Sequence, residues 1–270
     1  MRVAALQMNS GPDVSANLAL AERLMSEASA DACKLVVLPE NFALMPEHGN
    51  DKATHAEAPN SGPVQSFLAA AARRYSLWIV AGSLPLISPE ISSGRVYGAC
   101  PVYDPEGECQ ALYRKIHLFD VDLADEQETY RESDSMYPGD EVVSVAAPCG
   151  RIGLTICYDL RFPEMFRCLV DEGSTVFTVP AAFTVPTGKA HWHTLLRARA
   201  IENLAYVIAA GQYGDHPDNR STFGHSLICD PWGRILAEQP AGNCIVAAEI
   251  DSALPAKLRS EFPALSNRRL

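Results

Sequence analysis

The stretch GLTICYDLRFPE, residues 153–164, decides how this chain folds. The apolar residues 152–157 predict a buried strand. Pro163 opens residues 163–172, which we expect to form a helix, because proline is favoured in the first turn of a helix. The chain therefore turns from a strand toward a helix, and Cys157 lies where the strand ends.

Strands and helices alternate on both sides of this turn. Apolar runs predict strands at residues 2–8, 34–39, 77–82, 142–146, 175–180, 206–212 and 245–250. Hairpins are expected for residues 95–109 with 110–119 and for 225–230 with 234–238. Further helices are expected at residues 15–32, 63–75 and 189–205, and the acidic segment 120–140 is interpreted as a long loop. This alternation predicts one α/β domain over residues 1–270, with mixed sheets covered by helices.

Composition excludes several classes of protein. Lys and Arg number 22 against 33 Asp and Glu, which gives a net charge of −11. Nucleic-acid binding and attachment to anionic membranes need clustered cations, so neither partner is expected. No apolar run reaches the roughly 18 residues that a membrane span requires.

The eight cysteines are expected to be reduced. The chain is long and its first residues resemble a strand rather than an export signal, so we expect a cytoplasmic protein without a disulfide framework. No cysteine or histidine pair has zinc-site spacing, and neither a metal nor a cofactor is expected. His191 and His193 flank Trp192, but the sequence identifies no partners with which they could bind a metal.

Three segments carry residues suited to chemistry. Glu40 follows the apolar strand Val36-Val37-Leu38 and Pro39, where a partly desolvated carboxylate suits general-base catalysis, although a loop or capping role is the alternative. Lys115 is expected on a strand, on the same face as His117 and Phe119. If its side chain points inward, the buried ammonium needs a carboxylate partner. The alternative is an edge-strand lysine in solvent.

Cys157 is the third candidate. A helix N-terminus and a nearby lysine both favour the thiolate, and the N–H of Tyr158 could donate to an oxyanion. The alternative is one more buried cysteine, which is our interpretation of the other seven.

The ordered motifs LPEN, YRKIHLF and GLTICYDLRFPE resemble the Glu-Lys-Cys triad of the nitrilase superfamily of carbon–nitrogen hydrolases. The reactive residues are separated by 75 and then 42 positions, and the resemblance covers essentially the whole chain. It implies a four-layer α-β-β-α sandwich, usually assembled as a homodimer or larger homo-oligomer. It also implies a second glutamate, which we carry to Glu132, with Glu126, Glu128 and Asp134 as alternatives.

The resemblance also narrows the reaction. HLFDVDL, TGKAHWHTLLRARAIEN and FGHSLICDPWG resemble the branch that contains deaminated glutathione amidase and omega-amidase. The implied reaction is hydrolysis of a small carboxylate-bearing primary amide by water, releasing ammonia through a thioester on Cys157. Deaminated glutathione amidase activity is favoured, with α-ketoglutaramate and N-carbamoyl amino acids as alternative substrates.

Residues for substrate binding are less defined by the sequence. Phe183, Thr184 and His191 are candidate lining residues, and Arg161 or Lys189 could meet a substrate carboxylate. Ordinary packing and helix-start roles are the alternative for all of them. A non-catalytic scaffold is the competing class of protein, against which the intact Glu40, Lys115 and Cys157 argue.

Overall fold

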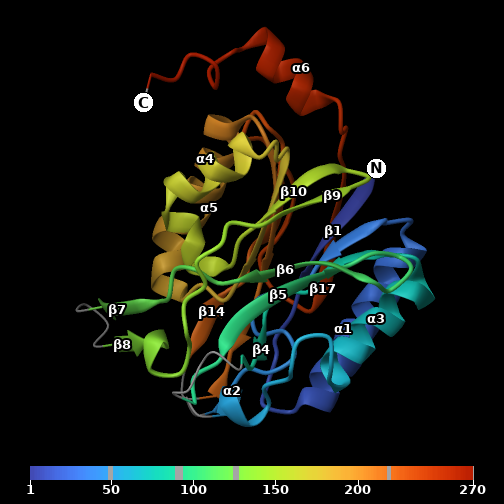
Figure 1. The fold of residues 1–270 in the computed structure, drawn as a ribbon, viewed down its shortest axis with the longest axis vertical. Helices are drawn as coiled ribbons and strands as arrows, with labels where there is room; N and C mark the ends of the chain where they lie inside the picture. The colour runs from blue at the N-terminus through green and yellow to red at the C-terminus, as the bar shows by residue number, and fades with distance from the viewer. Residues whose placement is uncertain (48–50, 89–93, 124–127, 218–219, 270) are drawn as a thin grey trace.

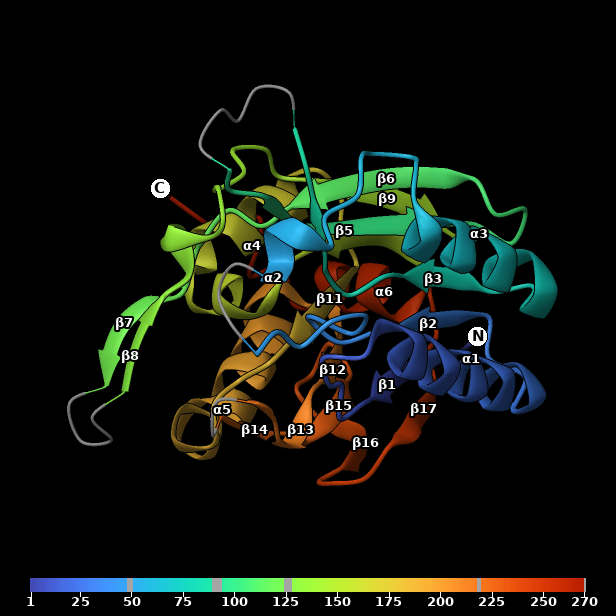
Figure 2. The same cartoon turned by 90° about the horizontal axis from the view of Figure 1, so that it is seen from below.

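The computed structural model describes residues 1–270 except 48–50, 89–93, 124–127, 218–219 and 270. Two mixed sheets lie face to face (Figures 1 and 2). The first has the strand order β17-β1-β2-β3-β5-β4, with β6 also paired to β5. Its strands are β1 (Arg2–Gln7), β2 (Leu35–Val37), β3 (Trp78–Val80), β4 (Leu84–Leu86), β5 (Tyr97–Tyr103), β6 (Cys109–Arg114) and β17 (Cys244–Glu249).

The second sheet has the order β16-β15-β12-β11-β10-β9. Its strands are β9 (Ser144–Ala147), β10 (Gly150–Leu154), β11 (Val176–Ala181), β12 (Tyr206–Gly211), β15 (Ser226–Cys229) and β16 (Ile235–Gln239). In each sheet three parallel strands form the centre, β1-β2-β3 in one and β10-β11-β12 in the other. Antiparallel strands flank both centres.

Helices cover the two outer faces. Figure 1 shows α1 (Val14–Ala30) and α3 (Pro63–Tyr75) outside the first sheet, and α4 (Pro163–Asp171) and α5 (Val185–Asn203) outside the second. The short α2 (Asp51–Thr54) lies beside the first sheet's loops, and α6 (Leu254–Glu261) lies near the C-terminus. The predicted four-layer α-β-β-α sandwich is confirmed for the described residues.

The pattern of β1 shows why the layers form. Successive side chains of a strand point to opposite faces. Val3 and Ala5 belong to the core shared with the second sheet, whereas Ala4 and Leu6 belong to the core shared with α1 and α3. Both faces are thus buried, as continuous apolar strands require.

The helix starts follow local chemistry. The Asp13 side chain caps α1 by accepting hydrogen bonds from the N–H groups of Ser15 and Ala16. Pro63 begins α3 after Gly62, as predicted. The α5 helix begins at Val185, four residues before the predicted start at residue 189, because Pro186 is accommodated in its first turn.

Two sequence predictions need correction. Residues 120–140 are not simply a loop: β7 (Asp120–Leu123) and β8 (Glu128–Arg131) pair as an antiparallel hairpin, followed by the 3-10 turn Glu132–Asp134. Figures 1 and 2 show this hairpin projecting from the sandwich. Lys115 does not lie on a strand, since β6 ends at Arg114, so the expected alternation of residues 114–119 does not occur.

Several short elements were not predicted. They are β4, α2, α6 and the small sheet formed by β13 (Tyr213–Asp215) and β14 (Ser221–Phe223). Within the described residues, no helix combines the length and apolar character needed to cross a bilayer.

Candidate active site

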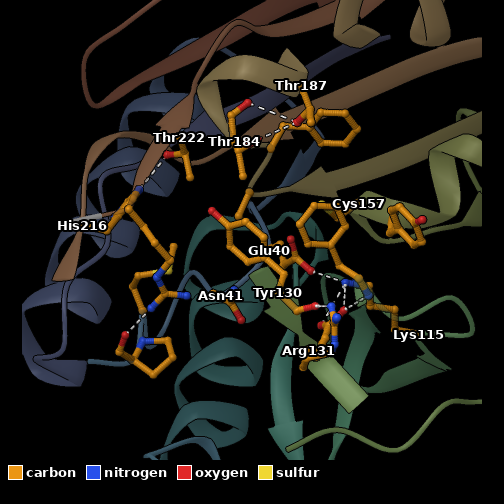
Figure 3. A pocket seen from close by; sticks show the side chains of 18 of the residues that line it. Glu40, Asn41, Lys115, Tyr130, Arg131, Cys157, Thr184, Thr187, His216 and Thr222 are labelled. Carbon is orange, nitrogen blue, oxygen red and sulfur yellow. Dashed lines mark hydrogen bonds and ion pairs between the residues drawn. The ribbon is translucent and has the colours of Figure 1, made fainter. Parts of the chain in front are cut away.

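The site lies where the parallel strands of both sheets end. Glu40 follows β2, Cys157 follows β10, and Phe183 and Thr184 follow β11. Carboxyl ends of parallel strands are the usual position of sites in α/β folds. Figure 3 shows Glu40, Lys115 and Cys157 gathered on one side of the resulting cavity.

The turn that carries Glu40 is fixed by its backbone contacts. The Gln212 side-chain amide donates to the Glu40 carbonyl at 3.0 Å, and the Asn41 N–H donates to the Ser83 hydroxyl at 2.9 Å. Gly82 has φ +62°, and a Cβ there would lie 2.0 Å from the Pro39 carbonyl oxygen. Only glycine permits this approach, so Gly82 helps to set the position of Glu40.

Lys115 is the centre of a buried charge cluster. Its Nζ lies 2.8 Å from Glu40 Oε1 and 2.8 Å and 3.0 Å from the two Glu132 oxygens, and the residue is 2% exposed. Burial lowers the pKa of the Lys115 ammonium, but the charges of Glu132 and Glu40 outweigh it and hold the pKa well above its ordinary value. Lys115 is therefore a cation with carboxylate partners, as an inward-facing lysine requires.

Glu132, which directly follows β8, connects this charge cluster to the projecting hairpin. Its Oε2 also accepts a hydrogen bond from the Phe119 N–H at 2.7 Å. Burial raises the pKa of its carboxyl, but Lys115 and then Lys52 outweigh that effect, and the pKa lies below its ordinary value. Of the alternatives, Asp134 is exposed, whereas Glu126 and the Glu128 side chain lie outside the described part. The structure thus brings Glu132, rather than Asp134, to Lys115.

Cys157 occupies a sharp elbow. Its φ is +49°, a conformation rare for residues other than glycine and often found at functional sites. The buried Asp159 carboxylate fixes the elbow by accepting from the Ile156 N–H at 2.8 Å, and it accepts from the Tyr113 hydroxyl at 2.7 Å.

The surroundings of Cys157 have opposing effects on the pKa of its thiol. Burial raises the pKa of its thiol well above the ordinary value, and Glu40 raises it further through charge and a hydrogen bond. Lys115 and the backbone of Ala182 act in the opposite direction but do not prevail. The resting group is therefore a thiol, and its attack requires a base.

A cavity of about 580 Å³ opens beside these groups. Tyr158, Phe183 and Thr184 line it, as predicted. His191 is exposed on α5, where Arg161 donates to its Nδ1 at 3.2 Å, and it is not among the lining residues. Lys189 is likewise exposed and is not among the lining residues.

The cavity carries cations beyond Lys115. The chain supplies them from four separate segments: Lys52, Arg131, Arg161 and Arg220. Of these four residues, the sequence analysis names only Arg161 as a candidate to bind a substrate carboxylate. Lys52 and Arg220 stand in polar segments without a motif, and only the folded chain brings them here. Burial lowers the pKa of the Lys52 ammonium, while Glu132 and Glu40 oppose that change.

The far wall of the cavity also contains His216, which the sequence did not indicate. Its Nδ1 lies 3.0 Å from the Ser10 carbonyl oxygen and its Nε2 lies 2.6 Å from the Thr222 hydroxyl. Burial lowers its pKa. The neutral ring therefore donates from Nδ1 to the carbonyl and accepts at Nε2 from the Thr222 hydroxyl. A dashed line in Figure 3 marks the contact between His216 and Thr222.

Comparison with known proteins identifies the family of the chain. The family model described as carbon-nitrogen hydrolase matches residues 2–259. The chain is 42% identical to deaminated glutathione amidase of Yersinia enterocolitica, covering 99% of this chain and 92% of that protein. It is 35% identical to an omega-amidase of Bos taurus, covering 99% of this chain and 95% of that protein. Nit3 of Saccharomyces cerevisiae, a nitrilase-superfamily member, superposes with a TM-score of 0.88 at 30% identity, covering 100% and 97% of the two chains.

Proposed function

The chain belongs to the carbon–nitrogen hydrolase family and is an enzyme that acts on amides, and we propose that Cys157 is its nucleophile. The observation that carries this proposal is the Lys115 ammonium, which is held between Glu40 and Glu132 at the wall of the cavity where Cys157 lies. A cation, a base and a thiol placed together are the groups that acyl transfer needs.

The reaction begins with attack of Cys157 Sγ on the amide carbonyl carbon. Glu40 takes the thiol proton as the S–C bond forms, which the position of its carboxylate beside the thiol supports. Lys115 and the Tyr158 N–H stabilise the resulting oxyanion, and one such donor contributes about 3–4 kcal/mol in other enzymes. Glu40 then gives the proton to the leaving nitrogen, the C–N bond breaks, and a thioester remains.

Water completes the cycle. Glu40 removes a proton from a water molecule that attacks the thioester, the C–S bond breaks, and the proton returns to Sγ. Glu132 acts as a positioning residue, because it contacts Lys115 and the Phe119 backbone. The products are a carboxylic acid and the freed amine or ammonia.

The substrate we favour is anionic. Lys52, Arg161 and Arg220 line the cavity of a chain whose net charge is −11, which favours a ligand with carboxylates. Deaminated glutathione is the first candidate, and α-ketoglutaramate and N-carbamoyl amino acids are the alternatives. The leaving group differs between these substrates. Deaminated glutathione has only secondary amides, so its hydrolysis would release a dipeptide. The release of ammonia that the sequence analysis expects therefore applies only to substrates with a primary amide.

A substrate comparison tests the proposal. Purified enzyme is incubated with deaminated glutathione, α-ketoglutaramate and an N-carbamoyl amino acid, and both primary amine and ammonia are measured. We expect the highest kcat/KM for deaminated glutathione with release of the dipeptide and no ammonia. Preference for α-ketoglutaramate or for the N-carbamoyl amino acid, each with ammonia release, would favour that alternative, and turnover of none of the three would refute this substrate class.

We also propose that the chain acts as one catalytic domain in a homodimer. Exposed apolar side chains gather near the edge strand β16: Ile201, Trp232, Ile235, Leu236 and Phe262. An exposed edge with such residues is typical of an interface. Sedimentation of the wild type as a dimer, and of Trp232→Asp as a monomer, would support this assembly, whereas a monomeric wild type would refute it.

A cytoplasmic location remains part of the proposal. All eight cysteines are free thiols, which suits a reducing compartment. Cell fractionation with compartment markers would test it.

A further inference from the structure

A second group of chemically active side chains lies outside the proposed active site. His193 on α5, His225 before β15 and Glu238 on β16 converge on one point. From this geometry we propose that His193, His225 and Glu238 form a binding site for a divalent transition-metal ion of the Zn²⁺ type.

The distances support a shared ligand position. His193 Nε2 lies 2.8 Å and His225 Nδ1 lies 2.6 Å from the same oxygen, Glu238 Oε1. All three ligand atoms lie within 4.8 Å of one another. Zinc binds imidazole nitrogen and carboxylate oxygen at about 2.0–2.2 Å, so small side-chain rotations would place one ion between the three atoms.

The donor set matches this class of ion. Two imidazoles and one carboxylate bind zinc in known enzymes, with water in the remaining position. His193 and His225 supply the two imidazole nitrogens, and Glu238 supplies the carboxylate oxygen.

The site is partly open to solvent, and packing contacts hold one of its histidines. The three side chains are between 25% and 34% exposed, which leaves room for an ion to enter and for water to complete its coordination. The Trp192 indole N–H donates to the His225 carbonyl oxygen at 2.8 Å, and the Phe223 ring stacks on the His225 ring at 4.1 Å. These contacts fix His225, and positioned ligands lower the ordering cost of metal binding.

A bound ion would join three separate elements. It would connect α5 to β16 and to the segment that follows β14. Thr222, a residue of β14, lines the active-site cavity. Phe223 packs so closely on α5 that a Cβ at Gly188 would lie 2.3 Å from it. We therefore expect the ion to stabilise this wall of the cavity rather than to take part in the reaction.

Calorimetric titration of ZnCl₂ into the full-length chain carrying Cys157→Ala tests the proposal, because that background removes the active-site thiol as a competing ligand. We expect one equivalent to bind, and His193→Ala and Glu238→Gln each to weaken binding at least tenfold. His191→Ala is the matched control, since His191 is exposed on the same helix but lies outside the cluster, and its affinity should be unchanged. Circular dichroism of each metal-free variant establishes that it is folded.

Two further measurements separate this site from adventitious binding. At a hundredfold excess over Kd, Zn²⁺ should raise the Tm by about 5 °C or more, and His193→Ala should remove this rise. Co²⁺ bound in its place should show ligand-field bands without thiolate charge transfer. Failure to bind, equal affinity in His193→Ala, or a cysteine-derived charge-transfer band would overturn the proposal.

Discussion

Replacing Lys115 with methionine tests the charge cluster most informatively. Methionine has a similar unbranched shape, so the main loss is the cation between Glu40 and Glu132. The two carboxylate oxygens each lie 2.8 Å from Nζ and are therefore at most about 5.6 Å apart. Two like charges about 5 Å apart repel by about 3 kcal/mol at an effective dielectric near 20.

The expected effects follow from that repulsion. Lys115→Met should lower the free energy of unfolding by about 3–5 kcal/mol, the usual cost of leaving a buried charge uncompensated. It should also lower kcat by about 10²–10³, because an oxyanion donor is lost. Lys52 remains near both carboxylates and reduces the loss of stability, so about 5 kcal/mol is the largest loss that we expect.

The double variant Lys115→Met/Glu132→Gln provides the matched control. It restores the cluster to one negative charge, so urea unfolding should show that at least half of the lost stability returns. The rate of amide hydrolysis should stay within tenfold of the single variant, because the cation is still absent. Equal instability of both variants, or recovery of the rate in the double variant, would refute the reasoning.

Three further predictions concern the cavity. Because attack by the Cys157 thiol requires a base and Glu40 is the proposed base, Glu40→Gln should lower turnover at least a hundredfold; turnover within tenfold of the wild type would contradict this. The pKa of the Glu132 carboxyl is lowered in the folded protein. Its ionised form therefore stabilises the fold above about pH 4.3, the ordinary pKa of glutamate, and this stabilisation is lost as the pH falls. The acid unfolding of Glu132→Gln should thus depend less steeply on pH than that of the wild type. Lys52→Met should raise KM for an anionic amide about tenfold and leave an uncharged analogue unaffected, and an equal change for both would argue against carboxylate binding.

The sequence predicted the framework because periodicity and proline positions are local signals. Residues 63–75 form a helix with the expected bounds, since Pro63 and the apolar spacing both act within one element. The β7–β8 hairpin was not predicted, because its acidic composition is typical of a loop. The pairing of its two strands is a contact between segments, which local composition does not indicate.

Residues with reactive side chains at strand ends were found more readily than those that surround them. Glu40, Lys115 and Cys157 stand in recognisable motifs, whereas Lys52 and Arg220 reach the cavity only through the packing of distant loops. The sequence neighbours of Cys157 favour the thiolate, whereas burial beside Glu40, which depends on the fold, raises the pKa of the thiol. The partners of His193 lie 32 and 45 positions away, which no spacing rule indicates.

The most direct test of the central claim is detection of the acyl-enzyme. Enzyme mixed with deaminated glutathione is quenched in acid within the first turnovers, digested and analysed by mass spectrometry, with Cys157→Ala as the control. We predict an acyl group on Cys157 alone, removed by hydroxylamine, and no turnover by the folded Cys157→Ala variant. Acylation of a different residue, or turnover by Cys157→Ala at the wild-type rate, would contradict the account.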